Sequence, residues 1–285
     1  MATRADAIIT KEGFVKNRQA SMAGKVAIVV GAGQTPGVSV GNGRATASLF
    51  ADRGAMVLAA DKNVAAAQET VDQIRSAGGE AIAVETDVTS EESVISMVAA
   101  CLDRWGRVDV LHNNVGVSLA GGDAPLTEIE TEAFARVTSI NLQGMVSTCR
   151  HVIPIMRKQE SGSIVNIASV AAIIDYPYVA YKTSKAGVIA LTQHIAIRNA
   201  EYGIRANVIL PGLMDTPMAI ENRVGRGGAT RDEVIAARNA KVPLGQKMGT
   251  GWDVARAAVF LASDDASFIT GASLTVDGGQ SLVVG

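Results

Sequence analysis

The chain has 285 residues, of which 48% are hydrophobic and 19% are charged, with a formal net charge of −2 at pH 7. This length allows a large core, and the nearly balanced charge argues against a surface for nucleic acid or an anionic membrane. No apolar run approaches the roughly 20 residues that span a bilayer, and Cys101, Cys149 and the three histidines lack metal-ligand spacing, so we expect a cytoplasmic protein without a metal site.

Short apolar runs alternate with helical patterns along most of the chain. Residues 1–22 mix charges of both signs, and we interpret them as a flexible or surface-packed N-terminal arm before a single domain of residues 23–285. The predicted strands are almost continuously apolar, as in a parallel sheet covered on both faces: Val26–Val30, Met56–Ala60, Ala81–Glu85, Val108–His112, Ser163–Ala168, Arg205–Leu210 and Ser273–Val276. The predicted helices are Gly43–Arg53, Val64–Ala77, Glu91–Trp105, Glu132–Lys158, Tyr181–Glu201 and Gly251–Ala262. This alternation predicts a doubly wound parallel sheet in a Rossmann-like three-layer α/β/α sandwich.

A glycine-rich loop joins the first predicted strand to the first predicted helix, from Gly31 to Gly43. Such loops let backbone N–H groups approach a pyrophosphate at the positive end of a helix. Asp61 ends the second strand, where a carboxylate accepts hydrogen bonds from adenosine ribose hydroxyls and repels a 2′-phosphate. The loop therefore predicts a dinucleotide site, and Asp61 favours NAD over NADP, although the neighbouring Lys62 weakens that preference.

Tyr181 and Lys185 lie four residues apart on a predicted helix, so their side chains share one face. A phenol with a pKa of about 10 is a poor acid–base catalyst at neutral pH. We expect the ammonium of Lys185 to lower the pKa of Tyr181 towards 7. Most Tyr/Lys pairs at this spacing are solvated helix surface, so the chemical interpretation depends on the other motifs.

Taken together, these motifs resemble the short-chain dehydrogenase/reductase superfamily in its single-domain form, over about residues 24–281. The motifs follow in family order: Gly31 to Gly43, Asp61, Asp87-Val88, Asn113-Asn114-Val115-Gly116, Asn141, Ser169, Tyr181-x-x-x-Lys185, Pro211-Gly212 with Thr216, and Val276-Asp277-Gly278-Gly279. The resemblance implies an NAD(H)-dependent alcohol dehydrogenase or carbonyl reductase. It also implies cofactor contacts from Gly31, Gly33, Gly41, Asn42, Gly43, Asp61, Asp87, Val88, Asn114, Val115, Gly116, Tyr181, Lys185, Pro211, Gly212 and Thr216.

Four catalytic residues follow from the same resemblance. Tyr181 would exchange a proton with the substrate oxygen, and Ser169 would polarise that oxygen. Lys185 would lower the pKa of the tyrosine and hold the nicotinamide ribose. Asn141 would hold a water molecule that links Lys185 to solvent, and an amide satisfied within the core is the alternative for this residue.

Two departures from the family pattern affect the cofactor site. Nine residues separate Gly31 from Gly41, where the family has three, so the loop carries an insertion of six residues. We expect a surface excursion, and the alternative is that it adds hydrogen-bond donors to the diphosphate. Val115 stands where the family commonly has alanine, and we expect only a small shift of the cofactor.

The substrate is less clearly indicated. The expected walls are Ser118 and Leu119, residues 171–178, and the loop beyond Pro211 with Met214 and Met218. These residues favour a hydrophobic or alicyclic secondary alcohol or ketone. Arg223 and Arg226 are expected to be solvated, although an anionic tail on the substrate is the alternative.

Two other functions stay open, an NADP(H)-dependent carbonyl reductase and a catalytically silent cofactor-binding protein of the same fold. A sugar-nucleotide epimerase is disfavoured because only about seventy residues follow Pro211. The resemblance also implies a homotetramer in which the helices Glu132–Lys158 and Tyr181–Glu201 pair between subunits.

Overall fold

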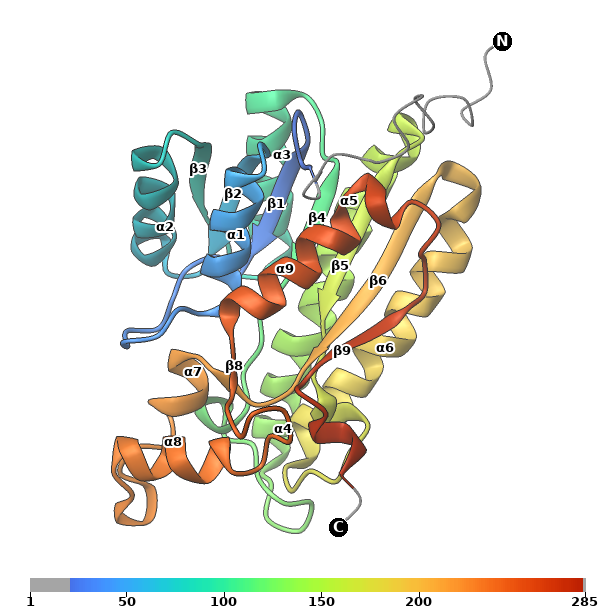
Figure 1. Ribbon diagram of the computed structural model, residues 1–285. Coiled ribbons are helices and arrows are strands. Elements are labelled where there is room, and N and C mark those ends of the chain that lie inside the picture. The colour runs from blue at the N-terminus through green and yellow to red at the C-terminus, as the bar shows by residue number, and fades with distance from the viewer. Residues whose placement is uncertain (1–20, 284–285) are drawn as a thin grey trace, which may run out of the picture.

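The computed structural model describes residues 21–283, which form a twisted sheet with helices on both faces (Figure 1). Seven strands pair in parallel in the order β3-β2-β1-β4-β5-β6-β9. Their bounds are β1 Val26–Val30, β2 Met56–Asp61, β3 Glu80–Glu85, β4 Val110–Asn113, β5 Gly162–Ile167, β6 Ile204–Pro211 and β9 Ser273–Val276. The predicted fold class is therefore confirmed. No helix among the described residues combines the length and the apolar character that crossing a membrane requires.

Two helical layers enclose separate apolar cores, because successive residues of a strand point to opposite faces of the sheet. In β1, Ala27 and Val29 pack towards one layer, whereas Val26, Ile28 and Val30 pack towards the other. The first layer holds α1 (Asn42–Asp52), α2 (Val64–Ser76) and α9 (Gly251–Ala262). The second holds α3 (Glu91–Trp105), α5 (Gly144–Gln159) and α6 (Val179–Asn199). Cys101 and Cys149 are free and buried in the second core.

The single helix predicted for Glu132–Lys158 is interrupted in the structure. It consists of α4 (Thr131–Thr138), a π-helical turn (η2, Ser139–Gln143) and α5. Asn141 lies in the π-helical turn, is fully buried and bonds to the backbone of another segment. A π-helical turn changes the direction of the side chains it carries and is frequent at functional sites.

Four short elements between β6 and α9 were not predicted. They are β7 (Met214–Asp215), α7 (Pro217–Ile220), α8 (Arg231–Asn239) and β8 (Gly249–Thr250). β7 and β8 pair in parallel as a small second sheet. In Figure 1, α7 and α8 lie beyond the ends of the main strands, at the lower left of the view.

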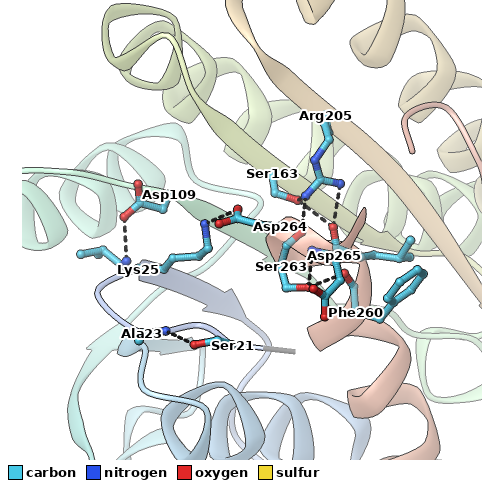
Figure 2. A network of polar contacts seen from close by, with 12 residues as sticks. Ser21, Ala23, Lys25, Asp109, Ser163, Arg205, Phe260, Ser263, Asp264 and Asp265 are labelled. Atoms are coloured by element: carbon cyan, nitrogen blue, oxygen red, sulfur yellow. Dashed lines mark hydrogen bonds and ion pairs between the residues drawn. The ribbon is translucent and has the colours of Figure 1, made fainter. Parts of the chain in front are cut away.

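A polar network ties the sheet to the end of α9 at the edge where the strands begin. Figure 2 shows Lys25 directed at Asp264, with which it forms an ion pair of 2.9 Å. Arg205 donates to Ser163 Oγ at 3.3 Å and to the carbonyl of Ser263 at 3.0 Å. This edge is held by charges and is remote from the carboxyl ends of the strands, where ligands bind in such sheets.

The proposed division into an arm and a domain stays a prediction. Residues 1–20 and 284–285 lie outside the described residues. Met22, which the prediction assigns to the arm, is fully buried in the first core.

Candidate active site

A cavity of about 900 Å³ opens at the carboxyl ends of the parallel strands. The loops after β1, β2, β3, β4, β5 and β6 all contribute to its wall. Every residue predicted to bind cofactor lines this cavity, as do Ser169, Tyr181 and Lys185. Asn141 is the predicted site residue that does not line it. Motifs spread over most of the chain are thus brought together at one place.

The glycine-rich loop packs too closely for side chains at Gly43 and Gly33. A Cβ at Gly43 would lie 1.8 Å from the carbonyl oxygen of Gly31, because α1 begins directly against the end of β1. A Cβ at Gly33 would lie 2.7 Å from Asp61 Oδ2. The backbone N–H of Gly33 donates to that oxygen at 2.9 Å, and Asn63 N–H donates to Oδ1 at 2.9 Å. The loop and Asp61 therefore hold each other in place.

The six-residue insertion is only partly the surface excursion that was expected. Residues 35–38 are exposed, but Gln34, Thr35 and Pro36 line the cavity. Gly37 lies so close to α7 that a Cβ there would be 2.9 Å from Pro217 Cβ. The inserted loop thus reaches from the glycine-rich loop to the opposite wall of the cavity, at α7.

Lys62 and Asp87 form an ion pair of 2.6 Å at the end of the cavity near Asp61. The hydrogen bonds from Lys62 and Thr89 lower the pKa of the Asp87 carboxyl to about 2. The Lys62 side chain is 78% exposed, so solvent screens this pair. Lys62, whose positive charge weakens the predicted preference for NAD, is therefore paired with Asp87.

Ser169, Tyr181 and Lys185 meet at the other end of the cavity. Lys185 Nζ lies 5.6 Å from the centre of the Tyr181 ring and donates to the carbonyl of Ile167 at 2.8 Å. The hydroxyl of Ser169 interacts with the phenol of Tyr181, which tends to lower the tyrosine pKa. These three side chains come from the end of β5 and from α6, so the sheet edge and one helix position them.

The expected lowering of the Tyr181 pKa is not what the structure gives. Burial raises the pKa of Tyr181 to about 12, and the charge of the neighbouring Tyr176 adds to this effect. Burial also lowers the pKa of Lys185 to about 7. Desolvation disfavours both charged forms, and this effect outweighs the attraction on which the expectation was based. Near neutral pH the phenol therefore keeps its proton.

Asn141 lies behind the cavity wall, where its side chain is held by the fold. Its Oδ1 accepts from Val117 N–H at 2.7 Å, and its Nδ2 donates to Val117 O at 2.8 Å and Ser184 Oγ at 3.1 Å. These contacts agree with the alternative of an amide satisfied within the core. They also fix the loop after β4 against the helix that carries Lys185.

Asp123, which the sequence analysis missed, holds the start of that helix. It is 6% exposed and accepts backbone hydrogen bonds from Ala180 at 3.0 Å and Tyr181 at 2.9 Å. Its second oxygen also accepts from Ser118 Oγ at 3.1 Å. A carboxylate at a helix N-terminus satisfies otherwise unpaired N–H groups and interacts favourably with the helix dipole. Asp123 therefore connects one predicted substrate wall to Tyr181.

Comparison with known proteins places this geometry in a family. Residues 37–281 match the family model described as Enoyl-(Acyl carrier protein) reductase. The 2-(R)-hydroxypropyl-CoM dehydrogenase of Xanthobacter autotrophicus is 37% identical over 261 residues, which cover 91% of this chain and 99% of the relative. The chain belongs to the short-chain dehydrogenase/reductase superfamily.

Two further short-chain dehydrogenases match over nearly their whole length. The 3beta-hydroxysteroid dehydrogenase 1 of Eggerthella lenta is 38% identical over 265 residues, covering 92% of this chain and 95% of the relative. A solved 7 alpha-hydroxysteroid dehydrogenase, complexed with NADH and 7-oxo glycochenodeoxycholic acid, has a TM-score of 0.82 and 32% identity, covering 93% and 98% of the two chains. The present chain is thus an oxidoreductase of the short-chain dehydrogenase/reductase type.

The residues of this short-chain dehydrogenase/reductase fit a nicotinamide dinucleotide. The cavity runs from Asp61 and Asp87 to Tyr181 and Lys185, and glycines at its floor let a ligand approach the backbone. At the start of α1, the buried Oδ1 of Asn42 has no hydrogen-bond partner among the described residues. Within residues 21–283 there is no group of three or more His, Cys, Asp or Glu side chains arranged to hold a metal ion.

Proposed function

We propose that this protein is an NAD(H)-dependent oxidoreductase that interconverts a secondary alcohol and a ketone, with Tyr181 as the acid–base residue. The observation that carries the proposal is the meeting of Ser169, Tyr181 and Lys185 at the wall of the large cavity. Neither Asn141 nor the glycine-rich loop alone would distinguish a catalyst from a protein that only binds the cofactor.

Each side chain has a role that its position supports. The nicotinamide, when bound, supplies or accepts the hydride. Ser169 donates a hydrogen bond to the substrate oxygen and polarises the carbonyl. Tyr181 gives its proton to that oxygen during reduction and takes it back during oxidation. The raised pKa of Tyr181 favours the protonated phenol, which is the form that reduction requires.

Lys185 positions the groups around Tyr181. Its bond to the Ile167 carbonyl places the amine beside both the tyrosine and the backbone before Ser169. A bound nicotinamide ribose would meet the same amine. Asn141 acts on Lys185 only through the loop and the helix that it joins, and the water relay proposed for it stays a prediction.

The preference for NAD is supported by the charges around Asp61. Lys62 is paired with Asp87, and the nearby Arg44 is paired with Glu69 at 2.9 Å. A 2′-phosphate would therefore meet the negative charge of Asp61 and two cations that already pair with carboxylates. An NADP(H)-dependent carbonyl reductase is the second candidate and is weakened by this arrangement.

The test is a panel of cyclic and acyclic secondary alcohols and ketones with NAD(H) and NADP(H), followed by the absorbance of the reduced nicotinamide. We expect turnover that is faster with NAD(H). Tight cofactor binding without turnover of any member of the panel would favour the catalytically silent protein. The homotetramer, in which α5 and α6 of the subunits would pair, stays a prediction that light scattering tests.

A further inference from the structure

Two arginines line the substrate end of the cavity. Arg238 belongs to α8, and Arg223 lies in the turn after α7, so both come from the segment between β6 and α9. The charge of Arg223 acts on both Tyr176 and Tyr181, which places it at the tyrosine end of the cavity. Arg238 in turn experiences the charges of Arg223 and Tyr176. The two cations therefore share one region of the wall.

Neither guanidinium takes part in an ion pair among the residues that the structure describes. Arg223 donates to the Ala219 carbonyl at 2.8 Å. Arg238 donates to Met248 Sδ, a weak acceptor, at 3.3 Å and makes a long contact of 3.5 Å to Met214 O. An arginine carries five N–H donors, so most donors of this pair are unused.

Other arginines of the same segment differ from this pair. Arg231, on the same helix as Arg238, pairs with Glu221 at 3.2 Å and does not line the cavity. Arg226 is exposed, donates to the Asn222 carbonyl at 2.7 Å and also lies outside the wall. Arg223 and Arg238 are thus the arginines of this segment that face the cavity, and neither pairs with a carboxylate among the described residues.

Placing these cations together is unfavourable without an anion. Burial and the like charge of Arg223 lower the pKa of Arg238 to about 10. Asp215 acts on Arg238 in the opposite sense, but the two are not within ion-pair distance. Partly desolvated cations without a counter-ion are costly in a folded protein. An anionic ligand would remove that cost and would use the free donors in charge-assisted hydrogen bonds.

We propose that the substrate of this enzyme carries a carboxylate or sulfonate group away from its reacting carbon, and that Arg223 and Arg238 bind this group. The apolar side chains of Leu213, Met214 and Met218 line the same cavity and would contact the body of the substrate. The proposal rests on the proposed function, because it takes Tyr181 as the reacting end. The proposal replaces the expectation that Arg223 is solvated. It does not include Arg226 in the anion site.

Binding measured without turnover separates this proposal from the proposed function. The full-length protein saturated with NADH is titrated with cyclohexanecarboxylate, benzoate, benzenesulfonate and the neutral cyclohexanecarboxamide. We expect at least one of the anions to bind about tenfold or more tightly than the carboxamide, as a charge-assisted contact allows. Comparison of the two carboxylates with benzenesulfonate shows which anionic group Arg223 and Arg238 prefer. If no anion of the series binds better than the amide, the proposal is overturned.

Variants assign the effect to the two arginines. Arg238→Gln and Arg223→Gln should each weaken anion binding about tenfold or more, whereas Arg226→Gln should leave it unchanged. Arg238→Lys should recover part of the loss because it keeps the charge. NADH affinity and thermal unfolding are measured for each variant. A loss of NADH affinity with unchanged anion affinity would assign the arginines to the cofactor pyrophosphate and would overturn the proposal.

Turnover gives the second readout. With 4-oxocyclohexanecarboxylate and its methyl ester, the parent should favour the acid, and the glutamine variants should raise KM for the acid while changing kcat little. Equal use of acid and ester by parent and variants would overturn the anion site and leave the oxidoreductase standing. Anion binding that depends on Arg238, without turnover of any ketone, would support the anion site and contradict the proposed function.

Discussion

The backbone N–H of Tyr181 donates to the buried carboxylate of Asp123, with 2.9 Å between the nitrogen and Oδ2. The same carboxylate holds Ala180 N–H, so the first turn of α6 depends on a residue 58 positions away. We expect Asp123→Ala to lower the free energy of unfolding by about 2 kcal/mol, because it removes the acceptor of one buried and one part-buried N–H group. Urea denaturation of the two proteins measures the difference.

A matched control for that experiment is Asp175→Ala. Asp175 is exposed and makes no side-chain hydrogen bond within the described part of the chain. We expect its replacement to change stability by less than about 0.5 kcal/mol. Equal stabilities of the two variants would show that Asp123 does not hold the helix.

Cofactor selectivity depends on the charge of Asp61. Asp61→Asn keeps an oxygen that accepts from Gly33 N–H but removes the negative charge that would repel a 2′-phosphate. We expect the ratio of kcat/KM for NADH to that for NADPH to fall in this variant. Steady-state kinetics with one ketone and both cofactors give the ratio. A parent enzyme that prefers NADPH would refute the role given to Asp61.

The stability of the cofactor-free protein should depend on pH through Lys185. Its pKa is lowered from 10.5 to about 7 by burial. Between these values the unfolded chain binds more protons than the folded one, so stability rises as the pH increases from about 7 towards 10. The cost of burying the lysine is fully present below about pH 7.

Lys185→Met should remove this dependence. We expect the stability of the variant relative to the parent to be greatest at and below about pH 7 and to shrink by about pH 9.5, because most of the cost of burying the lysine is lost as the pH rises from the folded pKa towards the unfolded one. Urea midpoints at the two pH values test this, and the contribution of Tyr181 largely cancels in the difference because both proteins carry it. A constant difference between the two proteins would contradict the buried, uncharged lysine.

The inserted loop should control how fast the cofactor leaves. A Cβ at Gly37 would press against Pro217 of α7, so Gly37→Ala should loosen the contact between the loop and the opposite wall. We expect faster NADH release in stopped-flow displacement. Val38 is 86% exposed, so Val38→Ala serves as the control. The same release rate for the parent and Gly37→Ala would mean that the insertion does not close the site.

Periodicity was enough to predict the sheet, and the resemblance to the short-chain dehydrogenase/reductase superfamily implied most of the cavity wall. The strand β1 and helix α3 have the predicted bounds, and Gly43 lies where only a glycine fits against Gly31. These features are local, because an apolar run followed by glycines can be recognised without knowing what packs against it.

Contacts between distant segments explain what the sequence did not reveal. Asp123 lies in a loop without a motif, and its role appears only when α6 begins beside it. Arg238 lies on α8, whose start is marked in the sequence by the capping pair Thr230 and Glu233. The spacing of Tyr181 and Lys185 predicted that their side chains lie close together. It did not predict their pKa values, which depend on burial.

The most direct test of the account is Tyr181→Phe, assayed for turnover and for NADH binding on the same preparation. The substitution removes the hydroxyl that would exchange the proton and keeps the ring that packs beside Lys185. We predict loss of turnover by at least about a hundredfold, with NADH affinity within a factor of about two of the parent. Turnover close to that of the parent would contradict the central claim.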